Sequence, residues 1–366
     1  MIRHLYVHIP FCPKVCPYCS FYKEASDRNK TRRFLDAVLA ELDRQQARWP
    51  LQPETIFFGG GTPSALSTSQ LEYLLSGLRE RLDLSRLVEW TLEMNPATVS
   101  LEKAAVLRQL GVNRISMGVQ SWDPKLLEVL GRVHTTAQAE RSYEILREAG
   151  FGNINLDLIF AIPTQTREQW VATLEKTIAL QPNHISAYCL TYEEDTAFYR
   201  RFQDGEFTQD ESWDADLFDL TIELLTAAGY EQYEISNYAQ PGLECRHNLA
   251  YWLGADYLGL GPSVFSTVGT ERWQNLADTA EYSRRILDTT ESPVAFSETV
   301  DRTTRRSEAI AFGLRTSYGV PLELLGGWEE KVNEYLAEGF FVRSGDRIRL
   351  TRKGKMVADT LAETFV

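Results

Sequence analysis

Short runs of β-branched and other apolar residues alternate with longer amphipathic segments through most of the chain, and this alternation strongly constrains the fold. Strands are predicted at residues 5–9, 55–58, 88–94, 114–119, 153–159 and 184–190. Helices are predicted at residues 31–48, 69–82, 102–110, 137–149, 168–180 and 215–228. Repeated βα units build a parallel sheet, so the pattern indicates an α/β fold, either a (β/α) barrel or a doubly wound sheet.

The polar residues of these units gather where the predicted strands end. The segment from Gly59 to Thr62 and the side chains of Glu93, Gln120 and Asp157 all end or follow an apolar strand. In (β/α) barrels the functional residues gather at the carboxyl ends of the strands. We therefore expect a partial or complete (β/α) barrel with its site at that end.

The last part of the chain has a different pattern. Helices are predicted at residues 305–318 and 329–338, followed by a hairpin whose strands, 340–342 and 347–350, flank Ser344-Gly345-Asp346. This order predicts a small α+β, winged-helix-like module. We expect the barrel at residues 1–235, a connecting segment at 236–289 and the module at 290–366.

Charge and hydropathy limit the partners. The chain has 38 basic and 51 acidic residues, a net charge of −13, which disfavours nucleic acid as a partner. No apolar run reaches the roughly 18 residues of a membrane span, and the N-terminus lacks the apolar stretch of a signal peptide. We expect a cytoplasmic protein; peripheral membrane contact and the oligomeric state stay open.

Three of the five cysteines lie on one predicted loop. Cys12, Cys16 and Cys19 form a C-x3-C-x2-C motif directly after the first strand. Three thiolates can bind three irons of a [4Fe–4S] cluster and leave the fourth iron open to a ligand. A zinc site is the alternative, but structural zinc sites use four protein ligands. We therefore predict a [4Fe–4S] cluster.

The string from Tyr6 to Cys12, Tyr-Val-His-Ile-Pro-Phe-Cys, together with the cysteine motif, resembles the radical S-adenosylmethionine (SAM) superfamily. The similarity is to the branch that contains oxygen-independent coproporphyrinogen III oxidase and the HemW haem chaperones. The resemblance implies that SAM binds the open iron, and that an electron donor reduces the cluster so that SAM can be cleaved to a radical.

The same resemblance implies the SAM-binding residues. They are Tyr6, Tyr18, Gly60, Gly61, Thr62, Glu93, Gln120, Arg132 and Asp157. Their chemistry suits the role, because glycine lets a ligand approach the backbone, arginine binds a carboxylate, and carboxylates accept hydrogen bonds from hydroxyl or ammonium groups. Each also has an ordinary structural interpretation, a tight turn for the glycines and core packing for the tyrosines.

A second motif lies downstream, where His247-Asn248-Leu249-Ala250-Tyr251-Trp252 resembles an H-N-x-x-Y-W string of the HemW branch. Imidazole is a good axial ligand of haem iron, and aromatic rings can cover a macrocycle. We therefore predict that His247 contacts haem; the alternative is a hydrogen-bonded structural histidine. Cys245 is a further candidate for haem contact, whereas Cys189 is expected to be a core residue.

Two features separate the chain from the oxidases of this branch. Those enzymes have another cysteine two residues after the third, where this chain has Phe21, and a longer segment before the cluster loop, where this chain has 11 residues. The sequence therefore predicts a haem chaperone that transfers haem to an acceptor protein. The alternative is a radical SAM enzyme acting on a porphyrin or porphyrinogen; whether the chain catalyses a reaction stays open, and an iron–sulfur scaffold alone is disfavoured.

Overall fold

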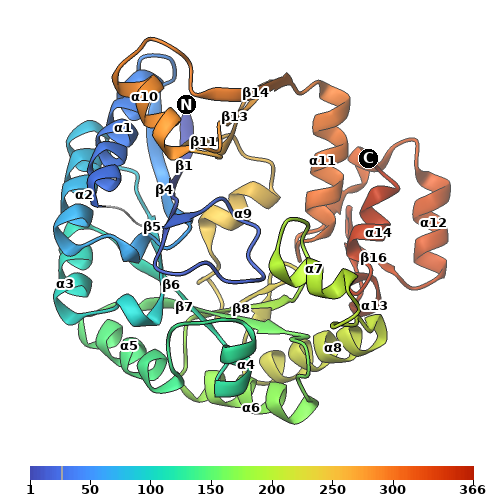
Figure 1. Ribbon diagram of the computed structural model, residues 1–366. Coiled ribbons are helices and arrows are strands. Elements are labelled where there is room, and N and C mark those ends of the chain that lie inside the picture. The colour runs from blue at the N-terminus through green and yellow to red at the C-terminus, as the bar shows by residue number, and fades with distance from the viewer. Residues whose placement is uncertain (26–27) are drawn as a thin grey trace.

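The computed structural model describes residues 1–25 and 28–366, and its centre is one twelve-stranded sheet that curves into a partial barrel (Figure 1). Its strand order is β14-β13-β12-β11-β1-β4-β5-β6-β7-β8-β10-β9. The parallel strands are β11 (Tyr257–Leu260), β1 (Ile2–Ile9), β4 (Leu51–Gly60), β5 (Glu89–Met94), β6 (Arg114–Gln120), β7 (Asn153–Phe160) and β8 (His184–Cys189). The prediction of a (β/α) barrel over a doubly wound sheet is confirmed.

Helices cover the outside of this sheet. They are α1 (Arg28–Gln46), α2 (Thr68–Arg81), α3 (Leu101–Leu110), α5 (Thr136–Glu148), α6 (Arg167–Ala179) and α8 (Glu211–Ala227). Two shorter helices, α4 (Pro124–Val129) and α7 (Ala197–Gln203), pack together at the carboxyl ends of the strands. Three of them, α2, α5 and α6, begin with a capping box, which explains why their starts could be predicted from sequence. The helix predicted from residue 215 begins four residues earlier, because the Asp210 side chain accepts hydrogen bonds from the backbone of Ser212 and Trp213.

The sequence did not predict the strands that extend the sheet beyond β1. After α9 (Arg246–Trp252), strand β11 pairs with β1, and the antiparallel strands β12 (Phe265–Val268), β13 (Glu271–Asn275) and β14 (Val294–Thr299) follow. Helix α10 (Thr279–Leu287) connects β13 to β14, while β9 (Glu231–Gln232) and β10 (Asn237–Ala239) extend the other edge. The division of the chain at residues 235 and 289 stays a prediction.

The C-terminal residues form a smaller unit with its own hydrophobic core. It contains α11 (Arg302–Leu314), β15 (Val320–Pro321), α12 (Glu329–Ala337), the hairpin β16 (Phe341–Ser344) and β17 (Arg347–Leu350), α13 (Arg352–Lys355) and α14 (Ala358–Glu363). The predicted hairpin and second helix are confirmed. The helix predicted to reach residue 318 ends at Leu314, because Thr316 forms a β-bridge with Glu234 and Ser317 N–H donates to the carbonyl of Tyr233.

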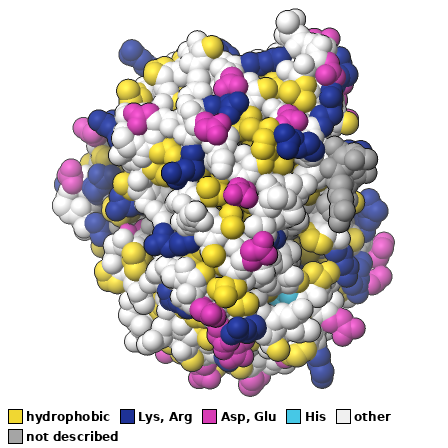
Figure 2. Space-filling view, turned by 90° about the vertical axis from the view of Figure 1, so that its left-hand side faces the viewer, with side chains coloured by type: hydrophobic (Ala, Val, Ile, Leu, Met, Phe, Trp, Pro, Cys, Tyr) yellow, Lys and Arg dark blue, Asp and Glu magenta, His cyan; other side chains and the backbone are white. Residues whose placement is uncertain are grey.

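The surface gives two further observations. No helix in the described part of the chain is long and apolar enough to cross a membrane. Figure 2 shows basic and acidic side chains interspersed over one face of the molecule, so that face has no continuous basic stripe.

Candidate cofactor site

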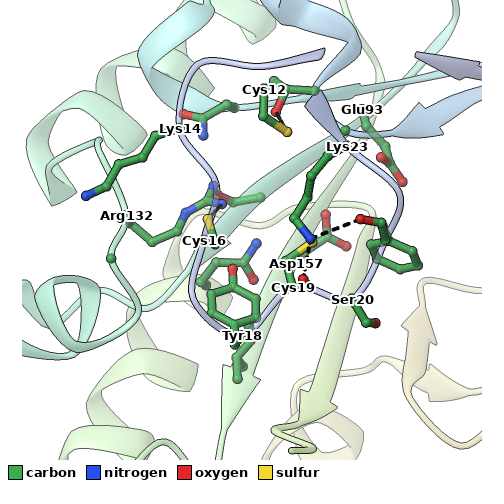
Figure 3. A pocket seen from close by; sticks show the side chains of 18 of the residues that line it. Cys12, Lys14, Cys16, Tyr18, Cys19, Ser20, Lys23, Glu93, Arg132 and Asp157 are labelled. Carbon is green, nitrogen blue, oxygen red and sulfur yellow. Dashed lines mark hydrogen bonds between the residues drawn. The ribbon is translucent and has the colours of Figure 1, made fainter. Parts of the chain in front are cut away.

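A pocket of about 440 Å³ opens at the carboxyl ends of the parallel strands (Figure 3). Eleven of the thirteen residues predicted for the site line it: Cys12, Cys16, Tyr18, Cys19, Gly60, Gly61, Thr62, Glu93, Gln120, Arg132 and Asp157. They come from segments up to 145 residues apart, and the barrel brings them together because its parallel strands all end at the same rim.

The cysteine loop forms one wall of this pocket. The Sγ of Cys12 lies 3.5 Å from the Oγ1 of Thr62, and an Nη of Arg132 lies 3.5 Å from the Sγ of Cys16. Lys23 donates hydrogen bonds to the carbonyls of Cys19 and Phe21, and so folds the loop back on itself (Figure 3).

The thiols suit a cluster better than a single metal ion. Burial raises the pKa of Cys12 and Cys19, while Thr62 lowers the first and the charge of Lys23 lowers the second. Among the described residues, no three His, Cys, Asp or Glu side chains lie close enough together to hold one metal ion. A cubane cluster takes one thiolate on each of three irons, so its ligands need not converge on one point. Three thiols on one loop are the donor set that the three cysteine-bound irons of a [4Fe–4S] cluster need.

The glycine segment after β4 lies directly against the cluster loop. Gly60 has a φ of 104°, and a Cβ there would be 2.3 Å from the ring of His8. A Cβ on Gly61 would be 2.8 Å from the backbone of Pro10. The segment must therefore be bare backbone, and Thr62 N–H donates to the carbonyl of Phe11 at 2.9 Å. The missing side chains therefore let the segment pack directly against His8 and Pro10 at the start of the cluster loop.

Two carboxylates form the floor of the pocket. Burial and the charge of Asp157 raise the pKa of Glu93 to about 8. Burial also raises the pKa of Asp157, although hydrogen bonds from Asn155, Ser186 and Ser116 oppose the shift. Two buried acids in one pocket favour a ligand that brings positive charge or hydroxyl donors.

Arg132 faces these acids from the other side of the pocket. One Nη donates to the carbonyl of Gly118 at 2.8 Å, and the Nε–H has no partner among the described residues. Gln120 ends β6 with a φ of 68°, which turns the chain toward the pocket. The guanidinium of Arg132 lowers the pKa of the buried Tyr18 phenol, although burial raises it more. The Arg132 side chain is thus placed to bind a carboxylate.

The two remaining predicted residues do not line the pocket. The ring of Tyr6 stacks on Phe57, and its hydroxyl lies 3.4 Å from the Nδ1 of His8. His247 has no exposed surface; its Nδ1 lies 2.7 Å from the Oγ1 of Thr55, and its Nε2 lies 2.8 Å from the hydroxyl of Tyr251. Both ring nitrogens of His247 are therefore engaged within the core.

The position of α9 argues against the predicted haem contact. Thr55 lies near the start of β4, five residues before Gly60, which places His247 about 16 Å from the pocket rim along the strand. Burial lowers the pKa of His247 to about 3, so the imidazole is neutral. Haem contact would require the ring to leave both hydrogen bonds and the core. Cys245 is also fully buried, with its Sγ 3.5 Å from an Oε of Glu89, and does not reach the surface.

Sequence reasoning missed several residues of the pocket. Cys189, expected in the core, is half-buried and lines the pocket together with Tyr188 and Leu190 at the end of β8. Their place at the end of a predicted strand was the signal that could have found them. Lys14 and Lys23 of the cluster loop line the pocket as well.

The chain is similar to a known superfamily and to curated proteins along nearly its whole length. The Radical SAM superfamily model matches residues 6–177, which include every described pocket residue up to Ile159. The haem chaperone HemW of Lactococcus lactis is 34% identical over 99% of this chain and 96% of its own length. The HemW proteins of Escherichia coli and Bacillus subtilis are 35% and 34% identical over 97% and 99% of their lengths.

A solved structure shares the fold. Coproporphyrinogen III oxidase (HemN) from Escherichia coli superposes with a TM-score of 0.86 at 24% identity, over 100% of this chain and 90% of that one. The likeness to HemN extends through the C-terminal unit. Because it is 34–35% identical to these three HemW proteins over 96% or more of their lengths, the chain belongs to the HemW family of the radical SAM superfamily.

Proposed function

We propose that this protein is a haem chaperone, which binds haem and transfers it to an acceptor protein, and that its pocket carries a [4Fe–4S] cluster with SAM. The observation that carries the proposal is the similarity to HemW haem chaperones over 94% or more of their length. We expect the protein to act in the cytoplasm. An electron donor would reduce the cluster there.

The cluster would be held by Cys12, Cys16 and Cys19. When bound, it supplies an open iron and one-electron chemistry. The chain's own contribution is to place three thiols on one loop, to restrain that loop through Lys23 and Thr62, and to bury it against the glycine segment.

SAM would be held by groups that complement its charges. The carboxylates of Glu93 and Asp157 suit its ammonium and ribose hydroxyls, and the guanidinium of Arg132 suits its carboxylate. Gly60 and Gly61 line the pocket beside these groups.

The chaperone is favoured over a coproporphyrinogen oxidase by the second residue after the cluster motif. Phe21 is 67% exposed and lines the pocket at the position where the oxidases resembled by this chain have a cysteine. A phenyl ring offers an apolar surface to a flat macrocycle and no thiol chemistry. The second candidate, a radical SAM enzyme acting on a porphyrin or porphyrinogen, rests on the fold shared with HemN and on the complete set of pocket residues.

An anaerobic haem titration of the cluster-reconstituted protein tests the proposal. We expect saturable binding and a haem absorption spectrum that differs from that of free haem, followed by loss of haem to a haem-free acceptor. If the protein does not bind haem specifically but converts a porphyrinogen in the presence of SAM and a reductant, the enzyme is the correct function.

The cluster assignment has its own test. Cys16→Ala should abolish the visible absorbance of the reconstituted cluster and lower the iron content. Cys189→Ala is the matched control, because Cys189 lines the same pocket outside the motif and should leave the cluster intact. A cluster retained in Cys16→Ala, or lost in Cys189→Ala, would overturn the ligand set.

A further inference from the structure

A chain of buried hydrogen bonds runs from the floor of the pocket into the interior of the barrel. Asp157 of β7 lines the pocket (Figure 3), and Asn155, two residues earlier on the same strand, shares its face. His184 of β8 is the register partner of Asn155, and Tyr233, after β9, is the last member of the chain. The side chains of Asn155, His184 and Tyr233 are each no more than 2% exposed.

The contacts nearest the pocket fix the direction of the Asn155 amide. Ser116 has one hydroxyl hydrogen, which it donates to Asp157 at 3.1 Å. The Ser116 oxygen therefore accepts from Nδ2 of Asn155 at 2.7 Å, and the same Nδ2 donates to Oδ1 of Asp157 at 2.7 Å. Because both N–H groups of the amide point toward the carboxylate, its oxygen points toward β8.

The amide oxygen determines the tautomer of His184. Oδ1 of Asn155 lies 2.7 Å from Nδ1 of His184, and an amide oxygen can only accept, so Nδ1 must carry a hydrogen. Burial and the charge of Arg114 lower the pKa of His184, so the ring is neutral and has one N–H. Nε2 is then an acceptor, and the Tyr233 hydroxyl donates to it at 2.8 Å.

Tyr233 is itself fixed where the barrel meets the C-terminal unit. Its N–H donates to the carbonyl of Asn237 at 3.1 Å, and its carbonyl accepts from Ser317 N–H at 2.8 Å. The hydrogen-bond chain therefore ends on a restrained residue, and the imidazole between Tyr233 and Asn155 is held from both sides.

His184 is the main support of the Asn155 oxygen. Ser186 lies 3.2 Å from that oxygen, but its one hydroxyl hydrogen has a closer acceptor, Oδ1 of Asn237 at 2.7 Å. An amide that turned over would place its oxygen against the oxygen of Asp157, and the two would repel each other. Removing the Nδ1–H of His184 should therefore loosen the amide and, with it, the carboxylate.

We propose that His184 is a positioning residue of the cofactor pocket, which acts through Asn155 to hold the Asp157 carboxylate in the orientation that accepts hydrogen bonds from a ligand. The proposal rests on the proposed SAM binding. It adds His184 and Asn155, which do not line the pocket but are joined to it by direct hydrogen bonds.

SAM binding to the cluster-reconstituted protein, measured by calorimetry, tests this role. His184→Leu removes both bonds of the ring, whereas His184→Asn keeps a donor near the place of Nδ1 and loses the bond to Tyr233. His184→Leu should weaken SAM binding roughly three- to tenfold, and His184→Asn should restore most of the affinity. His247→Leu is the matched control, because it also removes a buried imidazole with two hydrogen bonds, and it should keep the wild-type affinity.

A double-mutant cycle tests whether His184 acts through Asn155. Asn155→Ala should weaken SAM binding by itself, and adding His184→Leu should cause no further loss, because the link is already broken. Independent losses in the double variant would overturn the inference. So would an unchanged affinity in His184→Leu, or equal losses in His184→Leu and His184→Asn, because a purely structural role does not distinguish the two substitutions.

A second measurement needs no ligand. The protein has five histidines, and the ring-nitrogen NMR signals of the cofactor-free wild type report their tautomers. We expect His184, identified by comparison with His184→Asn, to carry its hydrogen on Nδ1, and we expect Asp157→Ala to shift its signals but not those of His247. A hydrogen on Nε2, or His184 signals that do not respond to Asp157→Ala, would overturn the inference even if His184→Leu does not fold.

Failure of the wild type to bind SAM is a different result. It contradicts the proposed function itself, and the NMR comparison then decides whether His184 is linked to Asp157.

Discussion

Asp157 carries more of the pocket's chemistry than its neighbours because it is both oriented and open to a ligand. Its two oxygens accept hydrogen bonds from Asn155 and Ser116, so the carboxylate cannot rotate freely. It still lines the pocket, where a ligand hydroxyl or ammonium can reach it. A side chain held in this way loses little entropy when the ligand binds.

Replacing Asp157 with Asn should therefore weaken SAM binding by roughly ten- to a hundredfold, because a hydrogen bond to a charged group contributes about 1.5–3 kcal/mol. Isothermal calorimetry on the cluster-reconstituted protein measures the change. Asp288→Asn is the control, since Asp288 is an exposed surface acid paired with Arg33. Equal affinities for both variants would rule out a role for Asp157.

At the scale of elements, α9 packs against the amino-terminal ends of strands β4 and β5. Its first backbone N–H groups donate to the buried carboxylate of Glu89, and His247 and Tyr251, four residues apart, lie on one face of the helix. His247 is thereby linked to Thr55 on β4, and Thr55 is in turn 2.9 Å from His4 on β1. The H-N-x-x-Y-W motif has a structural role here that its sequence alone does not reveal.

This arrangement predicts that His247→Gln keeps the haem affinity of the wild type and lowers the free energy of unfolding by about 1–3 kcal/mol, because a buried hydrogen bond is lost or left imperfect. Haem titration and denaturant unfolding measure the two effects. Asn248→Ala, on the same helix but only half-buried, should change neither. If a folded His247→Gln protein no longer binds haem, the H-N-x-x-Y-W motif, and not the pocket, contains the haem-binding site.

At the scale of the whole molecule, one buried acid joins segments that are far apart in the chain. Glu41 of α1 accepts hydrogen bonds from Gly261 N–H at 2.8 Å, Asn275 Nδ2 at 2.7 Å and the Tyr282 hydroxyl at 2.6 Å. These partners lie after β11, in β13 and in α10. Glu41 therefore fixes the sheet extension against the first helix of the barrel.

Burial raises the pKa of Glu41 from its ordinary value of 4.5 to about 7, whereas hydrogen bonds from Tyr282, Gly261 and Asn275 lower it. The folded protein then holds this proton more tightly than the unfolded chain does. The contribution of this group to stability is present below pH 4.5 and is lost as the pH rises toward 7.

The loss should amount to roughly 3 kcal/mol. Urea unfolding of Glu41→Gln across this range should show a flatter pH profile than the wild type. Glu72→Gln, at an exposed position of α2, should keep the wild-type slope. An identical slope in all three proteins would mean that Glu41 does not hold the proton.

The sequence by itself determined the six strands and six helices predicted for the barrel and most of the pocket. Strand and helix patterns depend on neighbours a few residues away, and the capping boxes of α2, α5 and α6 are local as well. The cysteine spacing and the polar ends of the strands are also local signals. Because parallel strands end at a common rim, local signals were enough to gather Cys12, Glu93 and Asp157 into one site.

Only the tertiary structure decided which layer of the barrel each inner residue occupies and which residues α9 contacts. The pairing of β1 with β11 joins residues about 250 positions apart, and the contact of Thr55 with His247 spans 192 positions. No local pattern encodes such pairs, because they depend on how the sheet closes and on what fills its interior. For the same reason an imidazole that resembles a haem ligand in the sequence is a hydrogen-bonded part of the core in the fold.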